Sequence, residues 1–258
     1  QAHIESVIAL YSNGRIQEAL DSVETLIKDY PNEPLLYNIS GACYKAIGQL
    51  DAALKSFEKT VTLKPDYADA HYNLGIVFMD LKRMDEALVS YERAIALDPD
   101  INFLFGILLH TKMHLCIWDD LASHLNELTN KVNNGEKALN PFPLLAMIDN
   151  PEIQRKVAEI YANEKYPQSR VLPKIERYQK HKKIRIGYFS QDFMDHPVAR
   201  LTAELYEIHD RERFEIHAFS FGPDTKDEMN LRIKKGVDHF HEVRTMSHKD
   251  IAILARSL

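Results

Sequence analysis

The sequence predicts an array of paired helices followed by a partial α/β domain. Amphipathic patterns with the helical period fill the first part of the chain, where Pro31, Pro65 and Pro99 recur every 34 residues. From residue 183 onward, short runs of alternating apolar residues take turns with helical segments. Alternation of strands and helices is typical of a parallel sheet, so we expect an all-α region joined to an α/β region.

The 34-residue period predicts three helix pairs over residues 1–100. The matching positions hold small residues, which let two helices approach closely: Ala19, Ala53, Ala87, Gly41 and Gly75. Proline ends the second helix of each pair, because it cannot donate the backbone hydrogen bond that a helix interior needs. The pattern resembles the tetratricopeptide repeat, a helix–turn–helix unit, and therefore predicts a tetratricopeptide-repeat α-solenoid.

Residues 101–165 keep the helical period but lose the repeat signature. We expect a degenerate helical pair here, a proline-bracketed loop at 140–143, and a transition helix in which Pro151 follows an Asn150 cap. Residues 166–182 contain two prolines and many basic side chains, so they are predicted to be a linker.

Residues 183–258 are predicted to form βα units of a partial α/β domain. The expected strands cover 184–190, 214–222 and 238–244, and a helical pattern follows each of them. A fourth strand would be due after Leu258, so we expect this region to be the first part of a larger domain.

One βα junction is a candidate site. Pro197 suits the first turn of a helix, which predicts that His196 is the N-cap residue. This histidine would lie at the carboxyl end of a strand, where open α/β sheets bind ligands. Helix capping alone is the competing explanation for His196.

Composition limits the possible functions. The net charge of −6 argues against nucleic-acid binding, and no apolar run reaches the roughly 18 residues of a membrane span. The two cysteines, Cys43 and Cys116, lie far apart without a CxxC pattern, which fits a reducing cytoplasm. Glycine-rich dinucleotide and P-loop motifs are absent, so no cofactor is expected in this chain.

We predict no metal site from the histidine spacings. His110 and His114 lie four positions apart on a predicted helix, and His239 and His241 share one face of a predicted strand. The helical spacing can bind zinc but brings no evident third ligand, and a shared strand face is necessary but not sufficient for a metal site, so ordinary surfaces are the preferred interpretation.

The motif after the first strand resembles a known family. Ser190-Gln191-Asp192-Phe193 is followed by His196-Pro197 and then by the segment FEIHAFSFGPD. Together with the repeats, this resembles the O-linked N-acetylglucosamine transferases, including the SPINDLY-type members, and looks like a bacterial member. The resemblance implies a Rossmann-like segment that begins the amino-terminal lobe of a two-lobed GT-B glycosyltransferase.

The resemblance also implies an activity, namely inverting transfer of N-acetylglucosamine from UDP-N-acetylglucosamine to protein serine or threonine. His196 would correspond to the active-site histidine of the family and act as a base or as a hydrogen-bond partner. Most of the family's donor site lies in the carboxy-terminal lobe. We therefore expect these 258 residues alone to be inactive.

The inner face of the repeats is the predicted protein- or peptide-binding groove, because such arrays bind along their concave surface. By register it would contain Asn38, Lys45, Tyr72, Asn73, Ile76 and Met79. Asn73 falls where the transferase family has an asparagine that holds extended peptide backbone, whereas Asn38 is one position off. Solvated polar residues without a ligand are the alternative.

Two other functions stay open at this point. The chain can be a tetratricopeptide interaction module that carries an α/β assembly domain and no catalysis. It can also form homo-oligomers, since an unpaired edge strand invites a second chain.

Overall fold

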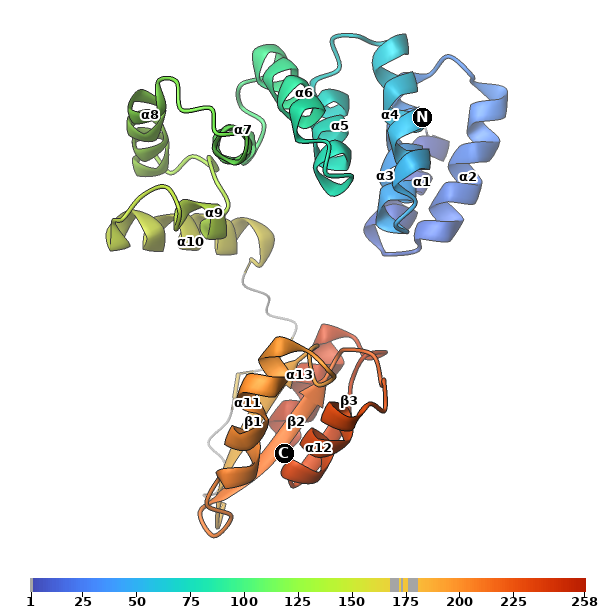
Figure 1. Ribbon diagram of the computed structural model, residues 1–258. Coiled ribbons are helices and arrows are strands. Elements are labelled where there is room, and N and C mark those ends of the chain that lie inside the picture. The colour runs from blue at the N-terminus through green and yellow to red at the C-terminus, as the bar shows by residue number, and fades with distance from the viewer. Residues whose placement is uncertain (1, 168–171, 173, 176–180) are drawn as a thin grey trace. The chain divides into compact units, whose positions relative to one another are not determined.

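The structure, a computed structural model, confirms the predicted fold class in two compact units (Figure 1). They fall within residues 1–167 and 168–258. The first unit is helical and the second contains a parallel sheet. The predicted linker lies largely outside the described residues, which are 2–167, 172, 174–175 and 181–258.

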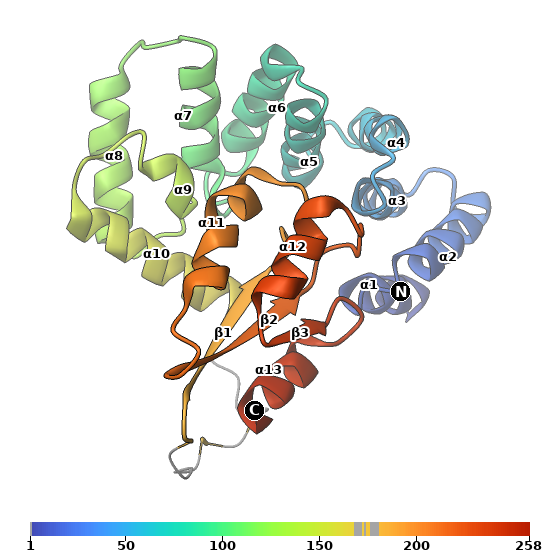
Figure 2. The same cartoon turned by 60° about the horizontal axis from the view of Figure 1, so that its bottom comes forward.

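Three antiparallel helix pairs begin the helical unit, and Figure 2 shows them following one another. Each helix packs against its partner, and the second helix of each pair packs against the first helix of the next pair. Their bounds are α1 Ala2–Ser12, α2 Ile16–Asp29, α3 Pro34–Ala46, α4 Leu50–Leu63, α5 Ala68–Asp80 and α6 Met84–Leu97.

The turn inside each pair needs a left-handed backbone. Gly14 and Gly48 supply it with φ angles of +76° and +79°. Lys82 occupies the equivalent position in the third pair and adopts φ +63°, at the steric cost that a Cβ brings. The turn geometry is therefore kept even where the repeat pattern loses its glycine.

Aromatic side chains fill the space that the repeat glycines leave. A Cβ on Gly41 would lie 2.7 Å from the buried Phe57 ring, and one on Gly75 would overlap the buried Tyr91 ring. Both rings belong to a continuous core that begins in α4 and extends through α5 and α6. It ends in α7 Leu104–His114, the helix that follows the three pairs. The glycines of the repeat pattern are therefore needed for the close packing of the two helices in each of these pairs.

The helices that follow the repeats form a separate core around Leu128, Leu139 and Leu144. It joins α7 to α8 Leu121–Asn133, α9 Pro141–Leu144 and α10 Pro151–Lys165. The prediction of a loop at 140–143 was wrong, because α9 lies there. Prolines fit this short helix, since its first turn needs no backbone N–H donors, and buried Leu144 anchors it.

The second unit is built of parallel βα units. Its elements are β1 Ile184–Ser190, α11 Pro197–Ile208, β2 Phe214–Ser220, α12 Glu228–Gly236, β3 His239–Glu242 and α13 His248–Ser257. Within the described residues the strands form one sheet in the order β1-β2-β3, with Ser190 opposite Ser220 and His217 opposite His239.

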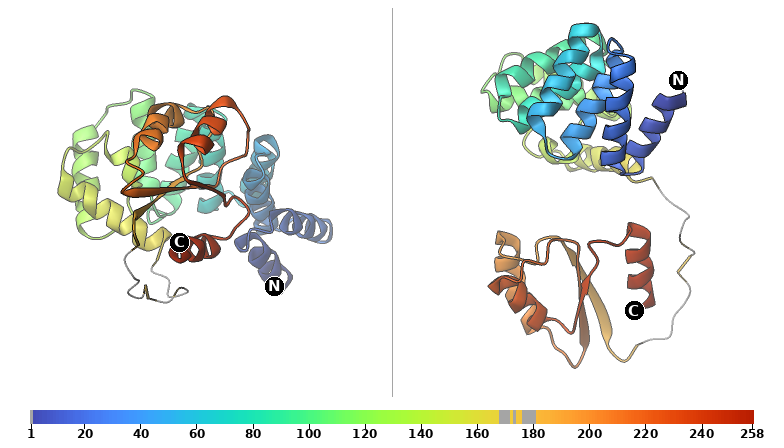
Figure 3. Two further views of the ribbon diagram at one scale, coloured as in Figure 1. Left: turned by 90° about the horizontal axis from the view of Figure 1, so that it is seen from below. Right: turned by 90° about the vertical axis from the view of Figure 1, so that its right-hand side faces the viewer.

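The two faces of this sheet are covered differently. Ala218 of β2 packs with Ala199 and Ala203 of α11 and with Ile233 of α12. Side chains alternate along a strand, so Glu215, His217 and Phe219 of β2 point to the opposite face. Figure 3 shows α11 and α12 together on one side of the sheet and α13 on the other.

Among the described residues, no helix has both the length and the apolar character needed to cross a bilayer.

Candidate functional site

The backbone places His196 at the carboxyl end of β1. The strand ends at Ser190, a short turn follows, and Pro197 occupies the first position of α11. His196 has an extended backbone, and its Nδ1 accepts the backbone N–H of Val198 at 3.2 Å. The predicted N-cap is therefore confirmed.

The turn that carries His196 is held by the neighbouring βα unit. Buried Asn230 donates its side-chain N–H to the Phe193 carbonyl oxygen at 2.6 Å. The backbone N–H of Asp195 donates to Asp227 Oδ2 at 3.0 Å. The Phe193 ring is also buried, so both backbone and side-chain contacts fix the turn.

The turns after β1 and β2 also meet directly. The backbone N–H of Phe221 donates to the Ser190 carbonyl oxygen at 3.2 Å. A Cβ on Gly222 would overlap the carbonyl oxygen of Gln191, so only glycine allows this approach. These contacts give the carboxyl edge of the sheet one defined shape.

Hydrogen bonding decides which ring nitrogen of His196 is available. Because Nδ1 accepts the Val198 N–H, a neutral ring carries its proton on Nε2 and can donate from there. Base chemistry at Nε2 requires the proton to move to Nδ1. Asp192 is placed to hold it after a small ring rotation, since its Oδ2 lies 3.8 Å from Nδ1. The His196 side chain is 38% exposed, so a ligand can reach it.

Carboxylates surround this helix terminus. Arg200 forms a two-fold contact with Asp195, at 2.7 and 3.0 Å, and this bond lowers the pKa of the Asp195 carboxyl. The Thr225 hydroxyl, followed by backbone N–H donors, lowers the pKa of Asp227. Both groups are therefore ionised at neutral pH; Arg200 balances the charge of Asp195, whereas the donors that contact Asp227 are neutral, so the charge of Asp227 disfavours a phosphate here. Neutral hydroxyl groups suit the site better.

In the predicted groove, the structure brings Asn38 and Asn73 together. The Asn73 side-chain N–H donates to Asn38 Oδ1 at 3.1 Å, which joins α3 to α5 across two repeats. This bond leaves the Asn38 NH2 group and the Asn73 Oδ1 atom unused, so the pair can still donate from Asn38 and accept at Asn73. Extended peptide backbone offers the complementary carbonyl and N–H.

The other predicted groove residues are half-buried. Tyr72, Ile76 and Met79 pack against the central core of the repeats, and the Tyr72 ring lies 6.2 Å from that of Tyr91. Burial raises the pKa of Tyr72. Lys45, near the end of α3, supplies a cation. These apolar side chains thus have a packing role whether or not a ligand binds.

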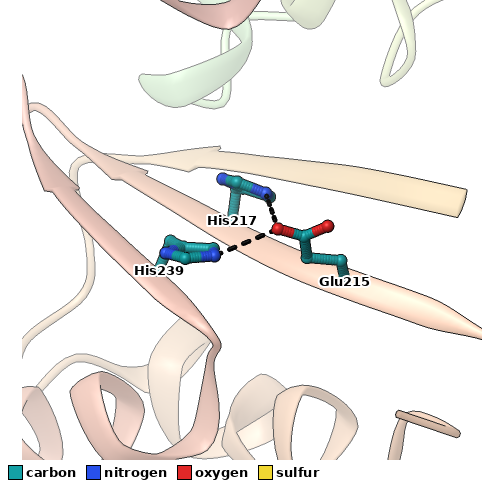
Figure 4. Close-up of side chains that lie close together, drawn as sticks. All are labelled: Glu215, His217 and His239. Carbon is teal, nitrogen blue, oxygen red and sulfur yellow. Dashed lines mark hydrogen bonds and ion pairs between the residues drawn. The ribbon is translucent and has the colours of Figure 1, made fainter. Parts of the chain in front are cut away.

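A second polar cluster, missed in the sequence, lies on the sheet face opposite α11 and α12 (Figure 4). Glu215 Oε1 lies 3.1 Å from His239 Nε2 and 3.4 Å from His217 Nε2. Arg185 donates to the other oxygen at 3.0 Å, and this bond lowers the pKa of Glu215. Burial, followed by repulsion from His239, lowers the pKa of His217. His241 Nε2 lies 3.1 Å from His217 Nδ1.

One signal in the sequence could have revealed this cluster. Glu215 and His217 alternate on one strand, as His239 and His241 do on the next. Parallel pairing in the register His217–His239 places the side chains of both pairs next to each other on the same face of the sheet. Without that register, each pair looked like an ordinary strand face.

His110 and His114 lie together, with ring centroids 4.4 Å apart. Among the described residues, no third histidine, cysteine or carboxylate completes a ligand group with them. The preference for an ordinary helix face over a metal site stays a prediction.

Comparison with known proteins supplies two kinds of match. Three models of the tetratricopeptide repeat match residues 4–58, 41–82 and 68–101. A model described as glycosyl transferase family 41 matches residues 155–253, a range that contains the His196 turn and the sheet.

A curated relative from Arabidopsis thaliana is the probable UDP-N-acetylglucosamine–peptide N-acetylglucosaminyltransferase SEC. It is 28% identical over 161 residues, which cover 56% of this chain and 16% of the relative. The chain therefore spans a small part of the relative's length.

Among solved structures, a mutant O-GlcNAc transferase of Thermobaculum terrenum matches with a TM-score of 0.47 and 20% identity, over 99% of this chain and 43% of that chain. The first tetratricopeptide region of Spaghetti (RPAP3), bound to an HSP90 peptide, matches with a TM-score of 0.43 and 23% identity. That match covers 45% of this chain and 91% of the other.

Proposed function

Since the chain carries tetratricopeptide repeats followed by part of a glycosyl transferase family 41 domain, we propose that it is the amino-terminal part of a protein O-linked N-acetylglucosamine transferase. The observation that carries this proposal is the family match over residues 155–253, which includes the fixed turn around His196. SPINDLY-type and bacterial character stay predictions.

The proposed reaction is inverting transfer to a serine or threonine hydroxyl. The hydroxyl oxygen bonds to the anomeric carbon, the bond from that carbon to the UDP oxygen breaks with its electron pair staying on UDP, and the hydroxyl proton passes to a base or to the departing UDP. The name of the Arabidopsis relative supports UDP-N-acetylglucosamine as donor. We assign no residue of this chain to the diphosphate, because carboxylates surround the His196 helix terminus. The 258 residues alone are therefore proposed to be inactive.

His196 is proposed to act through Nε2, which donates a hydrogen bond to an oxygen of the acceptor or of the sugar. The cap bond on Nδ1 supports this role. The competing role, proton removal by Nε2, needs Asp192 to hold the proton on Nδ1. Replacing Asp192 therefore distinguishes the two roles.

The repeats are proposed to bind the acceptor polypeptide in extended form. Support comes from the Asn38–Asn73 pair, whose remaining donor and acceptor match a peptide backbone. The free thiols Cys43 and Cys116 are consistent with the proposed cytoplasmic setting. Homo-oligomerisation through a sheet edge stays a prediction that sedimentation velocity can test.

The transfer proposal is tested in a longer protein that contains this chain, the remainder of the first catalytic lobe and the second lobe. We expect His196→Asn to preserve the helix cap and to lower transfer of radiolabelled N-acetylglucosamine by about 100-fold or more. His124→Asn, on α8, is the matched control and should leave transfer unchanged. Asp192→Asn should have a small effect if His196 donates and a large one if it is the base. Wild-type protein that transfers no sugar would contradict the proposal.

Peptide binding is tested with the 258-residue chain and extended serine- and threonine-containing peptides. Fluorescence polarisation should show about 10-fold weaker binding for Asn38→Ala/Asn73→Ala, the loss of roughly two peptide hydrogen bonds. Asn126→Ala, on the exposed part of α8, is the control. Equal binding by all variants would contradict the groove assignment. Binding without sugar transfer in the longer protein would favour a pure interaction module.

A further inference from the structure

The histidine-rich face of the small sheet contains a group of side chains that the proposed sugar transfer does not use. We propose that Glu215, His217 and His239 form a zinc site that joins β2 to β3. The inference is independent of the proposed function, because this cluster lies within the sheet and not at the His196 turn.

The carboxylate oxygen lies at the spacing from both histidine nitrogens that two ligands of a small ion require. Each pair of ligands on a tetrahedral zinc ion lies roughly 3.3 Å apart, since each is ~2.0–2.1 Å from the metal. Glu215 Oε1 lies 3.1 Å from His239 Nε2 and 3.4 Å from His217 Nε2, and all three atoms lie within 4.8 Å of one another. Figure 4 shows both rings directed at the same carboxylate oxygen.

Hydrogen bonding around His217 favours a cation. Its Nδ1 lies 3.1 Å from His241 Nε2, and donation by Nδ1–H leaves a lone pair on Nε2. That Nε2 atom is buried, has no hydrogen-bond partner among the described residues, and faces a carboxylate oxygen. In this tautomer, His217 Nε2 and the Glu215 oxygen are both acceptors, and a metal ion can bridge them. Ligating histidines commonly bond through their other nitrogen in this way.

The surrounding groups orient the remaining ligands. Arg185 holds Glu215 Oε2 at 3.0 Å, which keeps Oε1 directed at the two histidines. Its positive charge also weakens cation binding, so the affinity should lie below that of a closed structural site. The His239 side chain is 50% exposed, which gives its ring room to turn toward the ion and leaves a fourth position open to water.

Two imidazoles and one carboxylate are a ligand set that suits zinc. Glu215 and His217 come from β2, whereas His239 comes from the adjacent β3. An ion held by both strands stabilises their pairing, because it binds the folded sheet and not the unfolded chain.

The experiment uses the untagged 258-residue chain and Zn²⁺ as the probe. Isothermal titration calorimetry should give one Zn²⁺ per chain, and Co²⁺ should give the absorption bands of tetrahedral coordination. Glu215→Gln and His239→Ala should each weaken Zn²⁺ binding by about 10-fold or more. Their circular dichroism should match that of the wild type.

The control is His110→Ala/His114→Ala, which removes the other close histidine pair and should leave binding unchanged. Absence of Zn²⁺ binding to the wild type would overturn the proposal. Equal binding by Glu215→Gln, His239→Ala and wild type would also overturn it, because binding would then be adventitious. Loss of Zn²⁺ binding in the control variant would assign the ion to His110 and His114. If either site variant fails to fold, octahedral Co²⁺ bands from the wild type would still overturn the proposal.

Discussion

His196 has two roles to fill, because its ring caps α11 and is also the candidate group for binding the acceptor or the sugar. Nδ1 serves the helix, so only Nε2 is free to meet a ligand. A substitution can therefore remove the imidazole with or without loss of the cap, and the two effects can be measured separately.

We predict that His196→Ala destabilises the sheet unit by about 0.5–2 kcal/mol, because the Val198 N–H loses its acceptor. His196→Asn should cost less, since an asparagine side chain caps the same N–H group. Urea unfolding followed by circular dichroism measures both. Equal losses for the two variants would show that the cap bond does not carry the stability.

The two cysteines should differ strongly in reactivity. Burial raises the pKa of Cys43 to about 11, whereas Cys116 is exposed. Thiolates are the reactive form, so a disulfide reagent at pH 8 should modify one thiol in the folded chain and two after unfolding. Cys116→Ser should abolish the fast reaction, and Cys43→Ala should leave it intact.

The raised pKa of Cys43 also predicts a pH dependence. The unfolded thiol ionises first, so the stabilising contribution is present below its ordinary pKa and is lost as the pH rises toward about 11. Thermal unfolding between pH 8 and pH 10 should show a smaller loss for Cys43→Ala than for wild type. An unchanged slope would contradict this assignment.

At the scale of elements, the close contact between α5 and α6 depends on a missing side chain. We predict that Gly75→Ala destabilises the repeats by about 1–3 kcal/mol, because its Cβ overlaps the Tyr91 ring. The cost should fall in a Tyr91→Leu background, where the ring is gone. A double-mutant cycle from chemical unfolding measures this coupling, and additive losses would contradict it.

Local rules were enough to predict several elements. The 34-residue period survives because each pair repeats the same small-residue packing, and the cap at His196 follows from Pro197 at the first helical position. The error at α9 shows the limit of such rules, since Pro141 and Pro143 fit a loop or a helix start equally well. Burial of Leu144 in a distant core decides between them.

The cluster of Glu215, His217 and His239 required tertiary information to be found. Nothing in the local pattern fixes the partner of His217, because strand register depends on how β2 and β3 pack with α11 and α12. The same holds for Asn38 and Asn73, which are 35 positions apart and meet although the repeat period is 34. Contacts could therefore be predicted from the sequence where they are local or follow the repeat period. They could not be predicted where they depend on how two elements align.

At the scale of the whole molecule, each compact unit has its own core. The helical unit contains the repeat core around Phe57 and Tyr91 beside other core clusters, and the sheet unit contains the cluster around Phe193 and Ile233. We therefore expect two separable unfolding transitions, because substitutions in one core leave the other core intact.

Two variants test this independence. Asn230→Ala leaves the buried Phe193 carbonyl oxygen without its donor, which should cost the sheet unit about 1–3 kcal/mol and lower its melting temperature by about 4–8 °C per kcal/mol. Gly75→Ala should shift the helical transition alone. Differential scanning calorimetry measures both transitions in one experiment. If each variant shifted both transitions equally, the units would unfold as one cooperative body, and destabilising the His196 turn would then also destabilise the repeats.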